Sequence, residues 1–478
     1  MSTRPLYQQS ICELAAGLRN GEFSSVDLTQ HFLARIGQLD PSLNAYRLVC
    51  AEQALAEARV ADDALRSDGS QRLLQGIPFA VKDLFDVAGL PTSAGASFLA
   101  DNIAKEDSAP VKRLREQGMV LLGKLNTVQL AYGGVGINHD HGTPHNPWHQ
   151  APHIPGGSSS GSGVAVAAGL APVALGSDTG GSVRLPASLC GVTGLKTTVG
   201  QISRAGVFPL SWTLDSVGPL ARSAEDTAHL YQAMQGVDHD DPTTSGRPRH
   251  DVVSNLGDGV RGMRFAFAEG PLFDEAEDEI IRVVRKCGDV FGDLGAEVFS
   301  IDFPSAAFVK RARSVGVVTA AEASTGNQRY LQTCPERIDP VVLRRLELGC
   351  DVSTADYLQA YREMLNLRKE AAGALKGIDA LLVPTTPVCA RPVAVVDASL
   401  ESYFEVNTRL IGSTSIGNVL NLCGLSVPCG FSSDRSPIGL LIYGLPFEEH
   451  KILRAGVAYQ RATDWHGACP ELGWAVEE

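Results

Sequence analysis

Apolar residues near the start of the chain recur with helical spacing. Between residues 28 and 39 they fall three or four positions apart, at Leu28, Phe32, Ile36 and Leu39. This spacing predicts a helix with one buried face, started by the polar run at 24–27 and ended before Pro41. An alanine-rich stretch predicts a second helix over 52–65. We therefore expect residues 1–65 to form a helical N-terminal segment.

Beyond residue 76, short apolar runs alternate with segments of helical character. Strands are expected over 77–81, 119–122 and 172–175, and helices over 111–117, 162–170 and 184–190. Later in the chain, strands are expected over 380–384, 425–428 and 438–443, and helices over 277–294 and 355–375. The alternation favours an α/β layered fold. Since strands occur far apart in the sequence, we expect one sheet in a single domain over 1–478, with the polar stretch at about 237–262 as a surface insertion.

Charge and composition narrow the classes of partner. The chain carries a net charge of −13 over 478 residues, which argues against nucleic acid because phosphate contact needs a basic face. The longest apolar run, 164–176, is interrupted by Pro172 and falls short of the roughly 20 residues of a membrane span. Ten scattered cysteines without a C-x-x-C pair indicate buried free thiols. With no apolar signal segment at the N-terminus, we expect a cytoplasmic protein that does not bind membranes.

The first candidate for chemistry is Ser182, which follows Gly180 and Gly181 and precedes a predicted short helix. Glycines allow successive backbone N–H groups to converge on one point, so the amides of Thr179, Gly180, Gly181 and Ser182 could form an oxyanion hole. The partial positive charge of a helix N-terminus would add to it. The structural alternative is a serine that only caps the helix.

Two further segments complete the pattern. Ser158 lies in the run 156–163, which contains only glycine and serine and could equally be a flexible loop. Lys82 ends an apolar strand, so its amine could be driven into the interior, although an exposed lysine is the commoner outcome. A free lysine has a pKa of about 10.4, which burial can lower by roughly 3–5 units. A neutral Lys82 could then accept a proton from a serine hydroxyl.

Together these segments resemble the amidase signature family, whose members carry a Ser–Ser–Lys triad. The resemblance rests on GIPFAVKD around Lys82, PGGSSSGSG around Ser158 and GSDTGGSVRLPASLCGVTGLK around Ser182. It is strong over about 76–226 and returns more weakly at 424–430. The family's fold is a single α/β domain in which helices flank both faces of a mixed central sheet.

The sequence departs from the family's common pattern at two positions in these segments. Ser160 stands where glycine is common, and Val183 stands where isoleucine is frequent. Neither departure touches a group with a proposed catalytic role, so the expected chemistry is unaffected.

The resemblance implies a role for each motif residue. Ser182 would be the acyl-forming nucleophile, Lys82 the base, and Ser158 the bridge between them, following a cis peptide bond at Gly157–Ser158. Asp178 and Arg184 would hold the glycine turn, and Ser159 would support Lys82: the supporting residues are Ser159, Asp178 and Arg184. The expected activity is hydrolysis of a C–N bond in a small amide, aryl or alkyl amide, urea or carbamate, without a metal or organic cofactor.

The substrate cannot be fixed from these motifs. Aromatic residues near them could line an acyl pocket or simply be core: Phe85, Tyr132, Phe208 and Trp212. Tyr132, Gly133 and Trp212 are the candidate substrate-binding residues. The sequence leaves open a homodimer. It also leaves open a glutamine-cleaving subunit of a tRNA-dependent amidotransferase complex, or an amidase that needs a small partner subunit.

Other chemistries compete for the same residues. Five histidines at 139–153 could bind zinc, but they lack the rigid helical pairing of a zinc protease and suggest a solvated loop. Residues 157–161 match the G-x-S-x-G elbow of α/β-hydrolases, which would make Ser159 the nucleophile and require His450 or His466, yet no apolar strand precedes it. A nitrilase-like mechanism would use Cys190, which ends an apolar segment and is more typical of core. A chain that has lost catalysis is disfavoured because all three triad positions are filled.

Overall fold

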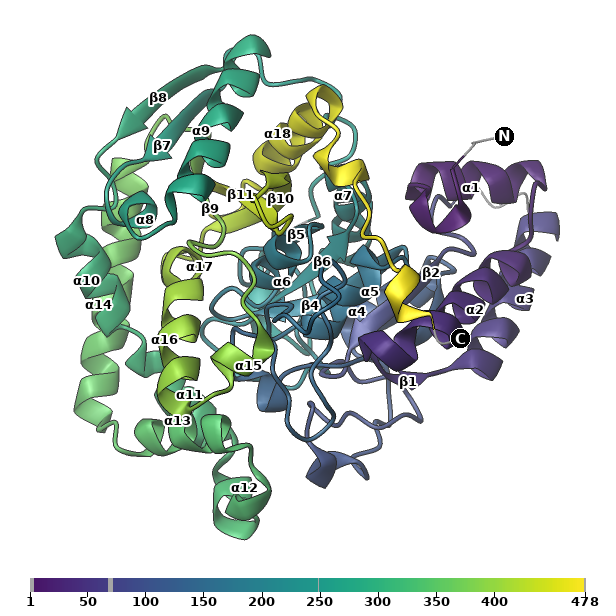
Figure 1. Ribbon diagram of the computed structural model, residues 1–478, viewed down its shortest axis with the longest axis horizontal. Helices are drawn as coiled ribbons and strands as arrows, with labels where there is room; N and C mark the ends of the chain where they lie inside the picture. Colours follow the sequence, from purple (N-terminus) through teal and green to yellow (C-terminus); the bar gives the residue numbers. More distant parts are fainter. Residues whose placement is uncertain (1–3, 68–71, 248, 477–478) are drawn as a thin grey trace.

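A computed structural model describes residues 4–67, 72–247 and 249–476 (Figure 1). Its centre is an 11-stranded sheet with the strand order β1-β3-β2-β4-β6-β5-β10-β11-β9-β7-β8. In chain order the strands are β1 (Tyr46–Val49), β2 (Pro78–Lys82), β3 (Val120–Leu125), β4 (Val173–Asp178), β5 (Thr193–Lys196), β6 (Ser216–Ala221), β7 (Arg264–Ala268), β8 (Glu297–Ile301), β9 (Ala380–Pro384), β10 (Cys423–Phe431) and β11 (Pro437–Gly444). One continuous sheet therefore joins segments from almost the whole chain.

The sheet is mixed, as the family resemblance implies. Strand β2 lies parallel to both β3 and β4, and β7 lies parallel to β8 and β9. The central strands between these two groups pair antiparallel, including β4 with β6 and β10 with β11. A mixed sheet flanked by helices confirms the predicted fold class.

Helices surround the sheet. In chain order the α-helices are α1 (Ile11–Asn20), α2 (Ser25–Leu43), α3 (Ala51–Ser67), α4 (Ala109–Glu116), α5 (Ser160–Ala167), α6 (Arg184–Leu189), α7 (Ala224–Met234), α8 (Pro271–Asp274), α9 (Asp278–Asp293), α10 (Ala306–Ser314), α11 (Val317–Gly326), α12 (Gln328–Thr333), α13 (Pro340–Cys350), α14 (Thr354–Ala374), α15 (Val393–Val396), α16 (Leu400–Leu410), α17 (Gly412–Val419) and α18 (Glu449–Ala462). In Figure 1, α1–α3 gather at one side of the molecule and α10–α17 at the other. Within the described residues, no helix combines the length and the apolar character that a membrane span requires.

The N-terminal helices begin where the sequence predicts, but one of them ends later. Ser24 caps α2 by accepting from the Asp27 amide, while the Asp27 side chain accepts from the Ser24 amide. The helix continues through Pro41 to Leu43, which corrects the expected end. Proline removes one N–H donor and crowds the carbonyl four residues earlier, but in this last turn the buried Leu39 and Leu43 pack against the core and hold the helix. The short strand β1, which follows this helix, was not predicted.

The elements around the motifs agree with the sequence. Strands β2, β3 and β4 and helices α4, α5 and α6 all lie within a few residues of their predicted positions. Strands β5 and β6 were missed because they mix apolar residues with threonine, lysine, serine and proline. The described residues of 237–262 form turns and one short 3₁₀ helix at Pro242–Thr244, and no strand.

Candidate active site

Lys82 occupies the last position of strand β2, and its side chain is fully buried. Its Nζ donates hydrogen bonds to Ser158 Oγ at 2.7 Å and to Ser177 Oγ at 3.0 Å. Burial lowers the pKa of Lys82 from 10.5 to about 7, although the nearby carboxylates of Asp215 and Asp178 raise it. Near neutral pH a large share of Lys82 is therefore an uncharged amine, which can accept a proton.

The backbone around Ser158 is held from several sides. The Gly157–Ser158 peptide bond is cis, as expected. The Ser158 carbonyl accepts from Thr127 Oγ1 at 2.8 Å, and the Gly157 N–H donates to the Gly134 carbonyl at 2.7 Å. A side chain on Gly157 would meet the backbone of Gly136 at 2.8 Å, closer than a Cβ is found, so this position requires glycine. These contacts fix the Ser158 hydroxyl toward Lys82.

Ser182 sits in the turn between strand β4 and helix α6. The Ser159 N–H donates to the Ser182 carbonyl at 3.2 Å, which joins the two serine segments through their backbones. Ser182 is almost buried, yet it lines the cavity described below. Ser159 Oγ donates to the Ser177 carbonyl at 3.3 Å. The hydroxyl that contacts Lys82 besides Ser158 is thus that of Ser177, and not that of Ser159 as the sequence suggested.

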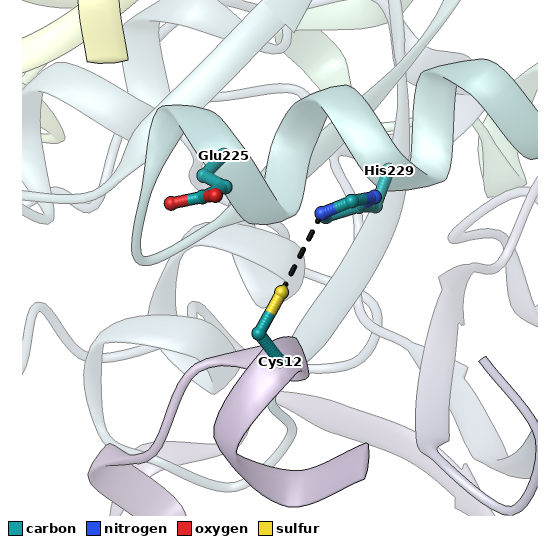
Figure 2. Close-up of side chains that lie close together, drawn as sticks. All are labelled: Cys12, Glu225 and His229. Carbon is teal, nitrogen blue, oxygen red and sulfur yellow. Dashed lines mark hydrogen bonds between the residues drawn. The ribbon is translucent and has the colours of Figure 1, made fainter. Parts of the chain in front are cut away.

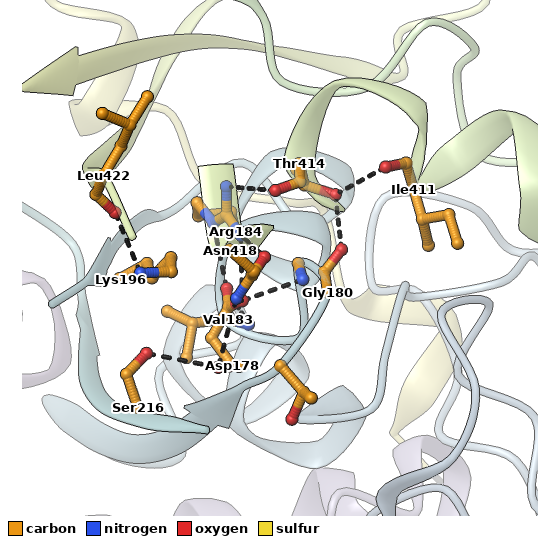
Figure 3. A network of polar contacts seen from close by, with 12 residues as sticks. Asp178, Gly180, Val183, Arg184, Lys196, Ser216, Ile411, Thr414, Asn418 and Leu422 are labelled. Carbon is orange, nitrogen blue, oxygen red and sulfur yellow. Dashed lines mark hydrogen bonds and ion pairs between the residues drawn. The ribbon is translucent and has the colours of Figure 1, made fainter. Parts of the chain in front are cut away.

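A buried ion pair braces the glycine turn (Figure 3). Arg184 donates to both oxygens of Asp178, at 3.0 Å from Nε and 2.9 Å from Nη2. Both side chains are completely buried. Burial alone would raise the pKa of Asp178, but Arg184 holds it well below its ordinary value. Asn418 donates to Asp178 Oδ1 at 2.8 Å and accepts from Arg184 at 2.6 Å, so helix α17 is tied to the same pair.

Asp178 also shapes the turn through backbone amides. Its oxygens accept from the Gly181 N–H at 2.8 Å and from the Val183 N–H at 3.1 Å. Gly181 adopts a φ of +133°, where side chains other than hydrogen are strained, and an added Cβ would clash with Thr414. The Gly181 N–H was expected in the oxyanion hole, but it donates its hydrogen bond to Asp178. Gly181 is needed for the backbone conformation of the turn.

Asp215 links the turn to the loop that precedes strand β6. Thr179 Oγ1 donates to Asp215 Oδ1 at 2.5 Å. Asp215 Oδ2 accepts from the Leu210 and Ser211 amides at 2.9 and 3.0 Å. Burial raises the pKa of Asp215 from its ordinary value. The same loop is also held by Glu322 of helix α11, which accepts a hydrogen bond from Ser211 Oγ at 2.5 Å.

A cavity of about 290 Å³ opens beside Ser182. The predicted residues Tyr132 and Gly133 line it together with Thr179 and Gly180. Its remaining walls come mainly from α10, α11, α13, α16 and α17, including Leu185, Leu214, Ala312, Thr319, Asn407, Ile411 and Val419. A polar turn together with walls that mix apolar side chains with a few polar and charged ones is typical of small-molecule sites.

Trp212 does not line this cavity. It is half exposed and borders a second cavity of about 210 Å³, which Phe208 and Ser177 also line. Phe85 is buried and lines neither cavity. Trp212 was a candidate because it lies near the motif segments in the sequence, but Asp215 and Glu322 hold its loop by hydrogen bonds in a position where Trp212 lines the second cavity.

Two arginines give the Ser182 cavity its charge. Arg313 pairs with Glu275 at 2.6 Å. Arg345 lies with its guanidinium 4.0 Å from the centre of the Tyr132 ring and makes no ion pair within the described part of the chain. Among the described residues that line the cavity there is no aspartate or glutamate. The described residues that line the cavity therefore include positive side chains and no negative ones.

The histidine-rich stretch divides among separate contacts. His139 Nδ1 lies 2.6 Å from Asp339, and its Nε2 lies 3.0 Å from Asp397. His149 and His153 stack with ring centres 3.9 Å apart. Among the described residues, the group of side chains spaced to hold a metal ion contains none of these histidines.

The competing nucleophiles occupy unsuitable surroundings. Cys190 is completely buried, and its Sγ contacts the Pro155 carbonyl at 3.3 Å. Burial raises the pKa of this thiol well above its ordinary value, which disfavours the thiolate. Ser159 has its hydroxyl against a backbone carbonyl, as described above. Neither residue lines the Ser182 cavity.

Sequence reasoning missed several residues of the site. Ser177 stands inside the GSDTGGS motif and could have been suspected from its position one residue before Asp178. Asn418 and Tyr443 carry no local signal, yet both bond Arg184, the latter at 2.6 Å through its hydroxyl. These residues lie more than 200 positions away, so only folding brings them to the turn.

Comparison with known proteins identifies the family of this chain. Residues 27–453 match the family model described as Amidase. A glutamyl-tRNA(Gln) amidotransferase subunit of Thioalkalivibrio sulfidiphilus is 36% identical, over 98% of this chain and 99% of that protein. The peptide amidase from Stenotrophomonas maltophilia superposes with a TM-score of 0.83 at 31% identity, covering 96% and 97% of the two chains.

A third similar protein comes from a vestigial complex that bears on the evolutionary origins of an s-triazine catabolic enzyme. Its chain superposes with a TM-score of 0.87 at 34% identity, covering 95% of this chain and 98% of that one. The relatives thus differ in what their names say they act on, while the fold and the length are shared. The chain described here belongs to the amidase signature family, whose enzymes act on C–N bonds.

Proposed function

We propose that this chain hydrolyses a carboxylic amide through an acyl-enzyme on Ser182. The observation that carries the proposal is the buried Lys82 amine, with its pKa lowered to about 7, in hydrogen-bond contact with Ser158 Oγ at 2.7 Å. A base needs a pKa near the working pH and a position within reach of the proton that it removes. Lys82 meets both conditions toward Ser158.

The reaction proceeds by a proton relay. Lys82 takes the proton of Ser158, to which it is already hydrogen-bonded. Ser158 takes the proton of Ser182 once their two hydroxyls come into contact, and Ser182 Oγ forms a bond to the amide carbonyl carbon. The oxyanion is stabilised by the Thr179 and Gly180 amides. The relay then returns a proton to the nitrogen, and the C–N bond breaks. Water attacks the acyl carbon by the same relay and releases the carboxylic acid, so no redox partner or further reactant is needed.

The charge of the cavity suggests the substrate. Arg345 offers a guanidinium that has no carboxylate partner among the described residues, and it lines the same cavity as Ser182. A short aliphatic acyl chain that ends in a carboxylate would fill this space, because a guanidinium binds a carboxylate through charge-assisted hydrogen bonds. We therefore favour a small amide with a negatively charged acyl end.

A second candidate function is supported by the relatives. The T. sulfidiphilus protein is named as a subunit of an amidotransferase, and it matches this chain over nearly its whole length. On that basis the chain would release ammonia from glutamine within a complex. Glutamine carries an ammonium group beside its carboxylate, and the described residues of the cavity offer no carboxylate to pair with it.

Three amides distinguish these functions: glutarate monoamide, glutamine and butyramide. The purified chain is tested for ammonia release, and mass spectrometry locates the acyl group. We expect glutarate monoamide to be preferred and Ser182 to carry the acyl group, with Ser182→Ala reducing the rate by about 10⁴-fold or more. Ser160→Ala is the matched control, since its buried hydroxyl has no hydrogen-bond partner among the described residues.

The outcomes separate the two candidates. A clear preference for glutamine, or turnover that appears only after a partner subunit is added, would support the amidotransferase function. Normal turnover by Ser182→Ala would refute the acyl-enzyme itself.

A further inference from the structure

Three side chains with metal-binding chemistry converge away from both cavities (Figure 2). Cys12 projects from helix α1, while Glu225 and His229 project from helix α7. None of the three lines the Ser182 cavity or the cavity at Trp212. The proposed amide hydrolysis uses none of them, so their convergence calls for a separate explanation.

The distance between the sulfur and the imidazole nitrogen fits a tetrahedral ion. Cys12 Sγ lies 3.6 Å from His229 Nε2, and one ligand atom from each of the three residues lies within 4.8 Å of the others. Zinc binds sulfur at about 2.3 Å and nitrogen at about 2.0 Å, and a tetrahedral angle between these bonds separates the two atoms by about 3.5 Å. The observed sulfur–nitrogen distance is therefore already that of a zinc pair.

The scaffold holds the three residues near one another, so that only the Glu225 side chain needs to turn toward the other two. Glu225 and His229 are four residues apart on α7, which puts them on the same helix face. Helix α1 is fixed against α7 by the Ile11 N–H, which donates to Asp226 Oδ1 at 2.9 Å. Each of these two anchoring residues is the chain neighbour of a ligand. The Ser10–Glu13 capping box further defines the start of α1.

The local charge favours a cation. Besides Glu225, two further carboxylates, Glu13 and Asp226, belong to residues that are chain neighbours of Cys12 and Glu225. Arg461 lies 3.7 Å from Glu225, but both side chains are largely open to solvent, so this pair is weak.

We propose that Cys12, Glu225 and His229 bind a zinc ion, with water in the fourth position. The Cys12 thiol loses its proton to solvent as the Zn–S bond forms, while the neutral imidazole and the carboxylate bind without chemical change. The ion links the N-terminal helix α1 to helix α7, which packs on strand β6 next to the catalytic strands. The ion should strengthen the attachment of α1, because a ligand that binds the folded state and not the unfolded state stabilises the folded state.

Cobalt(II) reports the thiolate ligand directly. The full chain is freed of metal by dialysis against a chelator and titrated with Co²⁺, and the near-ultraviolet thiolate-to-cobalt absorption band is recorded. We expect one equivalent to saturate the band, and Cys12→Ser to abolish it. His229→Gln and Glu225→Gln should each weaken binding by at least about tenfold. Cys350→Ser is the matched control, because Cys12 and Cys350 are both exposed free cysteines.

Zinc competition and thermal unfolding complete the test. Zn²⁺ should displace Co²⁺ and raise the melting temperature of the wild-type chain and of Cys350→Ser, but not that of Cys12→Ser or His229→Gln. Absence of the band at one equivalent, or a band that survives Cys12→Ser, would show that the 3.6 Å contact is only a thiol–imidazole hydrogen bond. These results do not depend on whether the proposed amide hydrolysis is correct.

Discussion

Ser177 Oγ lies 3.0 Å from Lys82 Nζ, so the buried amine contacts a second hydroxyl besides that of Ser158. Ser177 belongs to strand β4, which ends at the glycine turn carrying Ser182, and the segment of Ser158 is joined to that turn by the bond from the Ser159 N–H to the Ser182 carbonyl. Lys82 thus contacts Ser158 on one side and strand β4 on the other, and these two hydrogen bonds fix the position of its amine.

The lowered pKa of Lys82 predicts the pH dependence of catalysis. Only the neutral amine can act as a base, so kcat/KM should fall about tenfold per pH unit below a pKa of about 7 and level off above it. The profile is measured with an amide that does not itself ionise in this range, such as butyramide. A profile that stays flat down to about pH 5 would exclude Lys82 as the base.

The same burial should lower stability. The pKa of Lys82 is 10.5 in the unfolded chain and about 7 in the folded protein. The contribution of Lys82 to the free energy of unfolding therefore rises with pH between about 7 and 10.5, and it is lowest below about pH 7. Lys82→Met should therefore inactivate the enzyme and yet stabilise it by about 2 kcal/mol at pH 7. This is the net of a burial penalty of about 4 kcal/mol and two lost hydrogen bonds of about 1 kcal/mol each.

Urea unfolding of the two proteins at several pH values measures this difference. The stability gain of Lys82→Met should shrink as the pH approaches 10.5. If the variant is less stable than the wild type at neutral pH, Lys82 is charged in the folded protein and the proposed base is lost.

Loss of the ion pair between Asp178 and Arg184 should lower the free energy of unfolding by more than the loss of two hydrogen bonds would. Asp178→Asn leaves a completely buried guanidinium without its counter-charge, which should destabilise the protein by about 3–5 kcal/mol. Asp63→Asn breaks an exposed pair with Arg66 and should change stability by less than about 1 kcal/mol. Equal losses in the two variants, measured by urea unfolding, would contradict this account.

Arg345 should determine the preference for a negatively charged acyl end. Arg345→Gln should raise KM for glutarate monoamide by about 10- to 100-fold, since a hydrogen-bonded charge is lost, and leave kcat/KM for butyramide within about threefold. Arg344→Gln is the matched control. Arg344 is the chain neighbour of Arg345, but its side chain is exposed and pairs with Glu347 at 3.6 Å. Equal effects on both amides would show that Arg345 shapes the cavity without binding a carboxylate.

The sequence by itself determined the family, the fold class and the three motif segments. Lys82 was found because it ends an apolar strand, and the glycines before Ser182 predicted a tight turn. These are local signals: hydrophobic spacing fixes strands and helices, and glycine marks where the backbone must approach closely. Helix α2 shows the limit of such signals, because it continues through Pro41 where local preference predicted an end.

The tertiary structure alone decided how the site is braced and what its cavity presents. In the folded protein Ser177 hydrogen-bonds Lys82, the Gly181 N–H donates to Asp178, and Trp212 lines a second cavity. Folding also brought Asn418 to Arg184 across 234 positions of sequence. Hydrogen bonds between residues so far apart leave no periodic trace in the chain, because they depend on how separate elements meet and not on the spacing within any one of them.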